Sequence, residues 1–374
     1  MRIERAVVTM TKIPVRRAHR MAIGTTLAQE NIILRLYTDD GLEGLGEAPH
    51  MVGVSLKGES PGTVMLMLRD RLLPAVRGMN PFEIERIQQV MERAVPWNYR
   101  AKSAVNLALY DLVGKALGTP AHTLLGGRVR DTVPLSWSIP ITDGDAGARE
   151  AAEKIAQGWG ILKLKLGRPD PTEDVEMVRA IREAAGPQVR IRVDANQAYD
   201  VKTAIRVAQR IEKYDVEFFE QPVAWWDLDG LAEVSRATVL PIMADESATT
   251  LFGAVEVARR RAAQIFSIYV SSSGGLLNAK KMSDLGAIHG IAGYVGGALE
   301  GPIGVAAGLH FAGSTPSVTY GCELYGQFLL EEDVAAEPLH FRDGGLVVPT
   351  GPGLGVALDE DKLRHHTLET FEVR

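Results

Sequence analysis

Short apolar runs alternate with longer amphipathic stretches along the chain from about residue 133 onward. The runs have the length of buried strands, and the stretches between them, such as 172–185 and 201–214, have the periodicity of helices. Repeated strand–helix units predict a parallel sheet, and eight of them predict a closed (β/α)8 barrel. The expected barrel strands are Val133–Ile139, Ile161–Leu166, Val189–Asp194, Val216–Glu220, Leu240–Asp245, Gln264–Tyr269, Ile291–Val295 and Ser317–Glu323.

The residues before this repeat show an α+β pattern instead. Three apolar-rich segments predict strands, with a Thr-Asp-Asp-Gly hairpin signal between the last two. Three amphipathic stretches then predict helices. We therefore expect an α+β domain over 1–130, the α/β barrel over 131–330, and a C-terminal segment over 331–374 that returns to the first domain. The expected strands are Ile3–Met10, Asn31–Tyr37 and Leu42–Ala48, and the expected helices are Thr63–Leu73, Pro81–Ala94 and Ala101–Ala116.

Composition and charge narrow the class of protein. The 374 residues carry a formal net charge of -6, so no basic surplus is available to neutralise the phosphates of a nucleic acid. Cys322 is the one cysteine, which excludes a disulfide within the chain and a cysteine-rich metal site. No apolar window approaches the length of a membrane span, and the N-terminus lacks the apolar run of a signal peptide. We therefore expect a cytoplasmic protein that acts on a small molecule.

Three of the expected barrel strands end in a carboxylate. Asp194, Glu220 and Asp245 follow one another at intervals of one strand–helix unit. The ends of parallel barrel strands meet at one rim, where neighbouring strands lie about 4.8 Å apart. Clustered carboxylates repel one another unless a cation shares the site, and hard oxygen ligands favour Mg²⁺, with Mn²⁺ as a substitute. The pattern predicts a magnesium site; the alternative for each single acid is a cap on the following helix.

Two lysines lie on the second expected barrel strand. Lys163 and Lys165 are two residues apart, so their side chains point to the same side, which in a barrel is the inside. A neighbouring ammonium and a metal would lower the pKa of Lys165 and make it a general base, while Lys163 would orient the substrate carboxylate or tune Lys165 electrostatically. The alternative is a solvent-exposed pair, which the apolar neighbours disfavour. Asn196 and Glu246 are expected to hold the metal ligands by hydrogen bonds.

At these strand ends the sequence resembles the enolase superfamily, in particular the muconate-lactonizing-enzyme subgroup of the mandelate racemase–muconate lactonizing enzyme family. The resemblance covers essentially the whole chain. The motifs that carry it are Lys163-Leu164-Lys165, Asp194-Ala195-Asn196, Phe219-Glu220-Gln221-Pro222, Met243-Ala244-Asp245-Glu246-Ser247, Gly274-Gly275, Gly296-Gly297-Ala298-Leu299-Glu300-Gly301, Gly321-Cys322-Glu323-Leu324-Tyr325-Gly326 and Gly351-Pro352-Gly353-Leu354-Gly355.

The resemblance implies a capping domain, made of the N-terminal part and the C-terminal segment, over the barrel mouth. It also implies Mg²⁺ on the three strand-end acids and an enediolate intermediate formed next to a substrate carboxylate. Glu300 and Glu323 would line the substrate pocket, and a loop at 19–26 would cover it. Ser271 begins a serine run that could bind an anion through backbone N–H groups, with helix capping as the alternative. By analogy with the family, we expect a homo-oligomer.

Tyr269 departs from the pattern of the subgroup. Most members that it resembles carry a second lysine on the sixth barrel strand, five residues before the Gly-Gly pair, and here that position is Tyr269. A phenol can donate or accept a proton, but its acidic form carries no positive charge. A two-lysine racemisation is therefore disfavoured, and Tyr269 is either a catalytic group or a packing and orienting residue.

Several functions remain compatible with one strong base. The first is a cycloisomerase that acts on a muconate-like dicarboxylate. The second is a syn-dehydratase of a hydroxy acid or of a hydroxyproline such as cis-3-hydroxy-L-proline, because elimination does not need two opposed bases. The third is a racemase or epimerase of an amino-acid derivative that uses Lys165 and Tyr269 on opposite faces. A non-catalytic binding protein is disfavoured by the intact set of acids and lysines.

Overall fold

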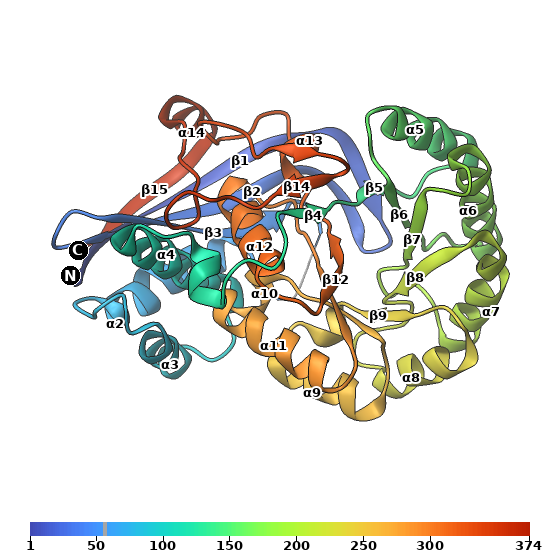
Figure 1. The fold of residues 1–374 in the computed structure, drawn as a ribbon, viewed down its shortest axis with the longest axis horizontal. Coiled ribbons are helices and arrows are strands. Elements are labelled where there is room, and N and C mark those ends of the chain that lie inside the picture. Colours follow the sequence, from blue (N-terminus) through green and yellow to red (C-terminus); the bar gives the residue numbers. More distant parts are fainter. Residues whose placement is uncertain (55–57) are drawn as a thin grey trace.

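The computed structural model describes residues 1–54 and 58–374. Its larger sheet contains eight parallel strands whose spatial order follows the sequence, as repeated strand–helix units predict. A parallel bridge between Leu135 and Cys322 links the first and last strands, and the sheet curls into the expected barrel (Figure 1). The strands are β5 (Trp137–Ile139), β6 (Ile161–Lys165), β7 (Arg190–Asp194), β8 (Val216–Glu220), β9 (Ile242–Ala244), β10 (Ile265–Ser267), β11 (Ala292–Val295) and β12 (Val318–Cys322).

Helices follow these strands and cover the outside of the barrel (Figure 1). Several begin at a side chain that accepts a hydrogen bond from the first turn, among them Asp143, Asp200 and Thr250. Asp245 directly precedes a 3₁₀ turn at Glu246–Ala248, but its side chain makes no capping hydrogen bond there. The helices are α5 (Gly144–Ala156), α6 (Pro171–Ala185), α7 (Val201–Ile211), α8 (Leu228–Ala237), α9 (Leu251–Arg260), α10 (Val270–Ser273), α11 (Leu276–Ile288), α12 (Pro302–Gly313) and α13 (Gly326–Leu329).

The first expected barrel strand is divided in two. Residues 132–134 form β4 (Thr132–Pro134), which pairs with β14 (Gly345–Val347) and, through it, with β13 (Phe341–Arg342). This pairing includes Pro134 and continues to Leu135, whose N–H donates to the carbonyl oxygen of Gly344 at 3.0 Å. The prediction that the tail around Leu346 returns to the first domain is therefore wrong for this stretch, because it pairs beside the barrel.

The remainder of the tail does reach the first sheet. This antiparallel sheet has the order β15-β1-β2-β3, so the two ends of the chain lie side by side (Figure 1). The expected loop at 19–26 is wrong: β1 and β2 extend through it as a long hairpin with its turn at 22–23. The strands are β1 (Ile3–Met21), β2 (Gly24–Thr38), β3 (Glu43–Met51) and β15 (Thr367–Val373), preceded by α14 (Glu360–His366).

The helices of this cap pack on the sheet and on the barrel. The central one, α4 (Tyr99–Leu117), is buried along most of its length. It approaches β3 so closely that a Cβ atom at Gly46 would overlap the backbone of Ala104. The others are α1 (Pro61–Met67), a π-helical turn at Leu68–Leu72, α2 (Leu73–Val76) and α3 (Ile84–Ala94). None of the helices in the described ranges is long and apolar enough to cross a membrane.

Candidate active site

The lysines and acids that the sequence singled out meet at one end of the barrel. In the strand registers, Lys165 lies beside Asp194, and Asp194 lies beside Glu220. All three side chains are buried, as is that of Asp245 at the end of the next strand. Parallel strands in register place the residues at their carboxyl ends next to one another, which is why a sequence interval of one unit becomes a spatial cluster.

Lys163 lies at the centre of this cluster. Its ammonium forms an ion pair with Glu323 and lies 2.8 Å from Glu220 Oε2 and 3.3 Å from Asp194 Oδ2. Burial disfavours the charged amine, but the three carboxylates outweigh it and hold the pKa of Lys163 well above its usual value. Lys163 is therefore a permanent positive charge that balances the acids.

The acids are not arranged around a common point as metal ligands. Within residues 1–54 and 58–374, no group of three or more His, Cys, Asp or Glu side chains has the arrangement that holds a metal ion. Lys163 instead bridges Asp194 and Glu220. The donors nevertheless fit a hard cation, because burial and the charge of Asp194 raise the pKa of Glu220 well above its usual value. Glu220 Oε1 also has no hydrogen-bond partner among the residues that the structure describes.

Lys165 lies next to one of the acids. Its Nζ lies 2.6 Å from Asp194 Oδ2. Burial and the positive charge of Lys163 lower the pKa of Lys165. The negative charges of the surrounding carboxylates, that of Asp194 foremost, raise this pKa by more, so the net shift is upward. An anion and not a cation is the nearest neighbour of the amine here, and the lowered pKa expected from a bound metal together with Lys163 stays a prediction.

The backbone N–H of Asn196 and the side-chain amide of Gln221 hold two of the acids in place. Asn196 adopts a left-handed backbone conformation (φ 41°), and its N–H donates to Asp194 Oδ1 at 2.8 Å. Gln221 Oε1 accepts the N–H of Asp245 at 3.0 Å, and Gln221 Nε2 donates to Ser247 Oγ at 2.8 Å. Sequence analysis missed the part played by Gln221, although its position directly after Glu220 was the available signal.

Tyr269 lies on the far side of the barrel from Lys165. It follows β10, which stands four strands from β6 in an eight-stranded barrel. Its hydroxyl donates to Asp245 Oδ2 at 3.2 Å, and a Cβ atom at Gly296 would overlap its ring. Burial and then the charge of Asp245 raise the pKa of Tyr269 well above its usual value. The side chain is therefore a neutral phenol.

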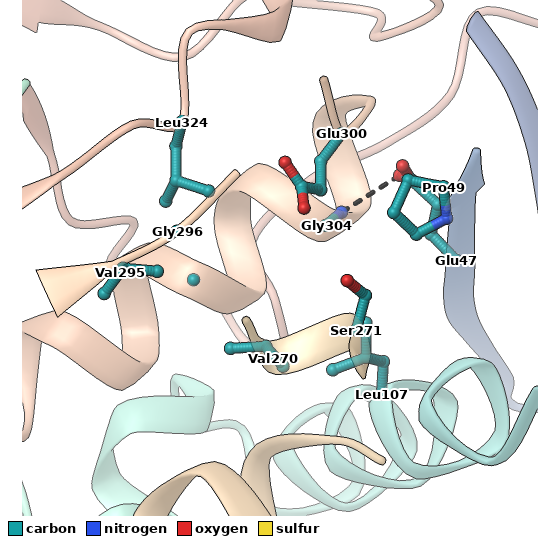
Figure 2. Close-up of a pocket in the computed structure, with 11 residues that line it drawn as sticks. Glu47, Pro49, Leu107, Val270, Ser271, Val295, Gly296, Glu300, Gly304 and Leu324 are labelled. Atoms are coloured by element: carbon teal, nitrogen blue, oxygen red, sulfur yellow. Dashed lines mark hydrogen bonds between the residues drawn. The ribbon is translucent and has the colours of Figure 1, made fainter. Parts of the chain in front are cut away.

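Two of the expected pocket residues lie at the junction of cap and barrel. Glu300 and Ser271 face a cavity about the size of one water molecule, together with Glu47 of β3 (Figure 2). Glu47 accepts the N–H groups of Gly301 at 2.6 Å and Gly304 at 3.0 Å at the start of α12. Burial raises the pKa of Glu47 and of Glu300 to about 7. Glu323, in contrast, belongs to the ion-pair cluster around Lys163.

Glu246 lines a larger groove between cap and barrel. The cap contributes Glu59 and Tyr99 to this groove, and the barrel contributes Trp225 and Ser272. Glu246 is 8% exposed and directly follows Asp245, so it lies between the groove and the acid cluster.

His19, at the tip of the β1–β2 hairpin, was singled out only as part of a covering loop. Its Nδ1 lies 2.9 Å from Arg17 Nη1, which can only donate, so the ring proton is on Nε2. Burial and the charges of Arg17 and Lys165 lower the pKa of His19 well below its usual value. The neutral ring lies beside the hydroxyl of Tyr325 and extends the polar lining of the site.

Comparison with known proteins gives a consistent result. Residues 4–126 match the model of the mandelate racemase / muconate lactonizing enzyme N-terminal domain, and residues 146–362 match the enolase C-terminal domain-like model. A chloromuconate cycloisomerase of Cupriavidus necator is 35% identical over 368 residues, 98% of this chain and 99% of that protein. A muconate lactonizing enzyme of Pseudomonas fluorescens, solved with muconolactone, has a TM-score of 0.95 and 34% identity, covering 98% and 99% of the two chains. An N-succinyl Arg/Lys racemase of Bacillus cereus has a TM-score of 0.96 and 30% identity over 100% of both chains.

Proposed function

Because the chain belongs to the mandelate racemase / muconate lactonizing enzyme family of the enolase superfamily, we propose that it is a Mg²⁺-dependent cycloisomerase. Its substrate would be a muconate-like dicarboxylate, and the reaction would pass through an enediolate. The similarity to cycloisomerases over nearly the full length of the chain supports this proposal. The homo-oligomeric state and the cytoplasmic location expected from the sequence stay predictions.

Asp194, Glu220 and Asp245 are the residues that would hold Mg²⁺, or Mn²⁺ in its place. Their hard oxygen donors, their burial and the raised pKa of Glu220 support this assignment. When bound, the ion stabilises the negative charge that develops on the oxygens of the substrate carboxylate. Asn196 and Gln221 keep Asp194 and Asp245 in position by the hydrogen bonds described above.

The position of Lys165 is the observation that carries the proposed reaction. Lys163 is surrounded by three carboxylates and Tyr269 is a neutral phenol, so Lys165 is the amine available to exchange a proton on one face of a substrate. In lactonisation, a substrate carboxylate oxygen forms a bond to a carbon of the double bond. The adjacent α-carbon then takes a proton from Lys165, and the reverse reaction returns that proton to the amine.

A second candidate is a syn-dehydratase, and the Tyr269 geometry favours it over a racemase. In this reaction Lys165 removes the α-proton of a hydroxy acid or of a hydroxyproline such as cis-3-hydroxy-L-proline. It then gives that proton to the hydroxyl leaving from the same face, so that a double bond and water form. A racemase needs a second proton carrier on the opposite face. There Tyr269 donates its hydroxyl hydrogen to Asp245 instead.

Isotope exchange tests the role of Lys165. The protein with Mg²⁺ is incubated in D2O with muconolactone, or with cis-3-hydroxy-L-proline, and deuterium at the α-carbon is measured by NMR. Lys165→Ala should reduce turnover and exchange by about a hundredfold or more, the usual contribution of a positioned acid or base. Lys202→Ala, which changes an exposed lysine, serves as the matched control.

The products decide between the two reactions. Loss of the ultraviolet absorbance of cis,cis-muconate supports the cycloisomerase, whereas formation of a cyclic imine from the hydroxyproline supports the dehydratase. Full exchange in the Lys165→Ala protein would contradict the assignment of this lysine.

A further inference from the structure

Arg100, the second residue of α4, is a buried guanidinium whose hydrogen bonds are incomplete. Its side chain is among the largest that are fully buried, with 2% of the residue exposed. Nη1 donates to the carbonyl oxygen of Pro49 at 2.9 Å, but within residues 1–54 and 58–374 Nε and Nη2 have no partner. Arginine stays charged in proteins, and a buried N–H of a charged group is costly when no acceptor meets it.

The acids near Arg100 do not supply the missing acceptors. Burial lowers the pKa of Arg100, and the charges of Glu59 and Glu300 oppose this. However, the carboxylate of Glu59 accepts the backbone N–H groups of Arg100 at 3.0 Å and Ala101 at 3.4 Å at the start of α4. The acids thus stabilise the positive charge from a distance and leave one edge of the guanidinium without a hydrogen bond.

Two serine hydroxyls on α10, the helix that packs on α4, are also buried without a hydrogen bond among the described residues. Ser271 and Ser272 of α10 are 5% and 4% exposed, and neither Oγ has a hydrogen-bond partner in the described part of the chain. Helix α10 packs directly on α4, because Ser103 Oγ donates to the carbonyl oxygen of Val270 at 3.2 Å. Figure 2 shows the Ser271 hydroxyl turned toward the cavity that Pro49, the partner of Arg100, also lines.

This junction adjoins the acid cluster and the groove. Tyr269, whose hydroxyl donates to Asp245 Oδ2, immediately precedes α10. Ser272 also lines the groove between cap and barrel, together with Tyr99 and Glu59. The cavity beside Ser271 holds about one water molecule.

The geometry of arginine indicates which group fits. Nε–H and Nη2–H are parallel donors on one edge of the guanidinium, and this edge matches the two oxygens of a carboxylate. We propose that Arg100, with Ser271 and Ser272, binds a second carboxylate of the substrate, remote from the reacting one. The assignment rests on the proposed function, since it places the substrate among dicarboxylates. It makes Arg100 a residue that determines specificity.

A pair of non-reacting probes tests the inference separately from catalysis. Adipate and hexanoate have six carbons each and differ by one carboxylate. Their binding to the full-length protein is measured by titration calorimetry with Mg²⁺ present. The wild-type protein should bind adipate about tenfold or more tightly than hexanoate, since a hydrogen bond to a charged group has an effect of this size. Equal affinities, or no binding of adipate, would overturn the proposal even if the enzyme turns over muconate.

Variants then assign the difference to Arg100. Arg100→Gln should remove the preference for adipate and leave the affinity for hexanoate unchanged, and Ser272→Ala should reduce the preference in part. Arg86→Gln, which changes an exposed arginine of α3, is the matched control. A preference for adipate that persists in Arg100→Gln overturns the assignment. The binding of inorganic phosphate is measured for the same variants. If Arg100→Gln changes only the binding of phosphate, the assignment is also overturned, because the site would then take a free anion and not the substrate.

Discussion

At the scale of the residue, neighbours decide what a side chain can do. Lys163 and Lys165 share a strand and a direction, yet Lys163 contacts three carboxylates and Lys165 contacts one. The first is therefore fixed as a counter-charge, and the second remains the group that can exchange a proton. Tyr269, at the position of an expected lysine, donates to Asp245 and so lacks the positive charge that a lysine would bring.

His310 gives a prediction on pH and stability at this scale. Its Nδ1 accepts the N–H of His122 and its Nε2 donates to the carbonyl oxygen of Leu354, which requires a neutral ring. Burial lowers the pKa of His310 from 6.5 to about 4. In the unfolded chain the His310 ring therefore binds a proton near pH 6.5, whereas in the folded protein it stays neutral at that pH. The stability contributed by the neutral ring is lost as the pH falls from 6.5 toward 4, by about 3 kcal/mol at most.

Urea unfolding of the wild-type protein and of His310→Gln at pH 7.5 and pH 4.5 checks this. The stability advantage of the wild type should shrink by about 2–3 kcal/mol at the lower pH. The wild type must be compared with the variant at each pH because Glu47 and Glu300 act in the opposite direction. Their pKa values are about 7, so their effect lowers the stability of the folded protein as the pH rises. His289→Gln, at an exposed position, should show no such change, and an advantage independent of pH would contradict the argument.

At the scale of the element, the start of α12 joins the two domains. Its positive end receives the carboxylate of Glu47, which comes from β3 of the cap, and the helix is buried throughout. Gly304 allows this close approach. A Cβ atom there would lie 2.8 Å from Glu300 Cβ and 3.3 Å from Glu47 Oε1. The contact between cap and barrel therefore depends on the absence of one side chain.

Gly304→Ala should accordingly destabilise the protein by about 1–3 kcal/mol, the usual cost of overpacking. The matched control is Gly62→Ala in α1, where the nearest atom would lie 4.0 Å from the new Cβ. That change should leave stability unchanged or raise it by up to about 1 kcal/mol, because alanine suits a helix better than glycine. Thermal and urea unfolding measure both, and equal effects of the two substitutions would refute the role of the close approach.

At the scale of the whole molecule, the cap and the barrel together enclose the site. The long β1–β2 hairpin reaches the barrel, where Arg17 donates to the carbonyl oxygen of Ser138 and to Glu150. Helix α4 packs on α10, and Glu47 contacts α12. The acid cluster is consequently fully buried, and an ion that binds it should stabilise the folded state of the entire chain.

Added Mg²⁺ should therefore raise the free energy of unfolding. At a concentration one hundred times its dissociation constant the gain is about 2.7 kcal/mol, and EDTA should reverse it. Thermal unfolding followed by circular dichroism measures the shift. Asp245→Asn should abolish it, whereas Asp229→Asn, which changes an exposed acid, should not. A shift of equal size in Asp245→Asn, or with NaCl at the same ionic strength, would speak against the proposed metal ligands.

The sequence alone determined the order of the barrel strands and the residues at their ends. Both follow from local patterns: apolar runs specify strands, and the interval of one unit brings strand-end residues to one rim. The limits at 130 and 330 that it predicts for the domains stay predictions. The pattern did not specify the length of β1 and β2. Both strands are longer than the apolar runs that predicted them, because the two strands stay paired beyond the ends of those runs.

Only the tertiary structure decided which groups contact one another across the fold. Lys163 lies among the acids, Glu300 and Ser271 face Glu47 at the junction with the cap, and Arg100 is buried at the start of α4 with Nε and Nη2 unpaired among the described residues. These contacts join residues far apart in the chain. They depend on side-chain direction, burial and the absence of a Cβ atom at glycines. A local pattern can place an acid at a strand end, but only the packed structure determines which charge or hydrogen bond meets it there.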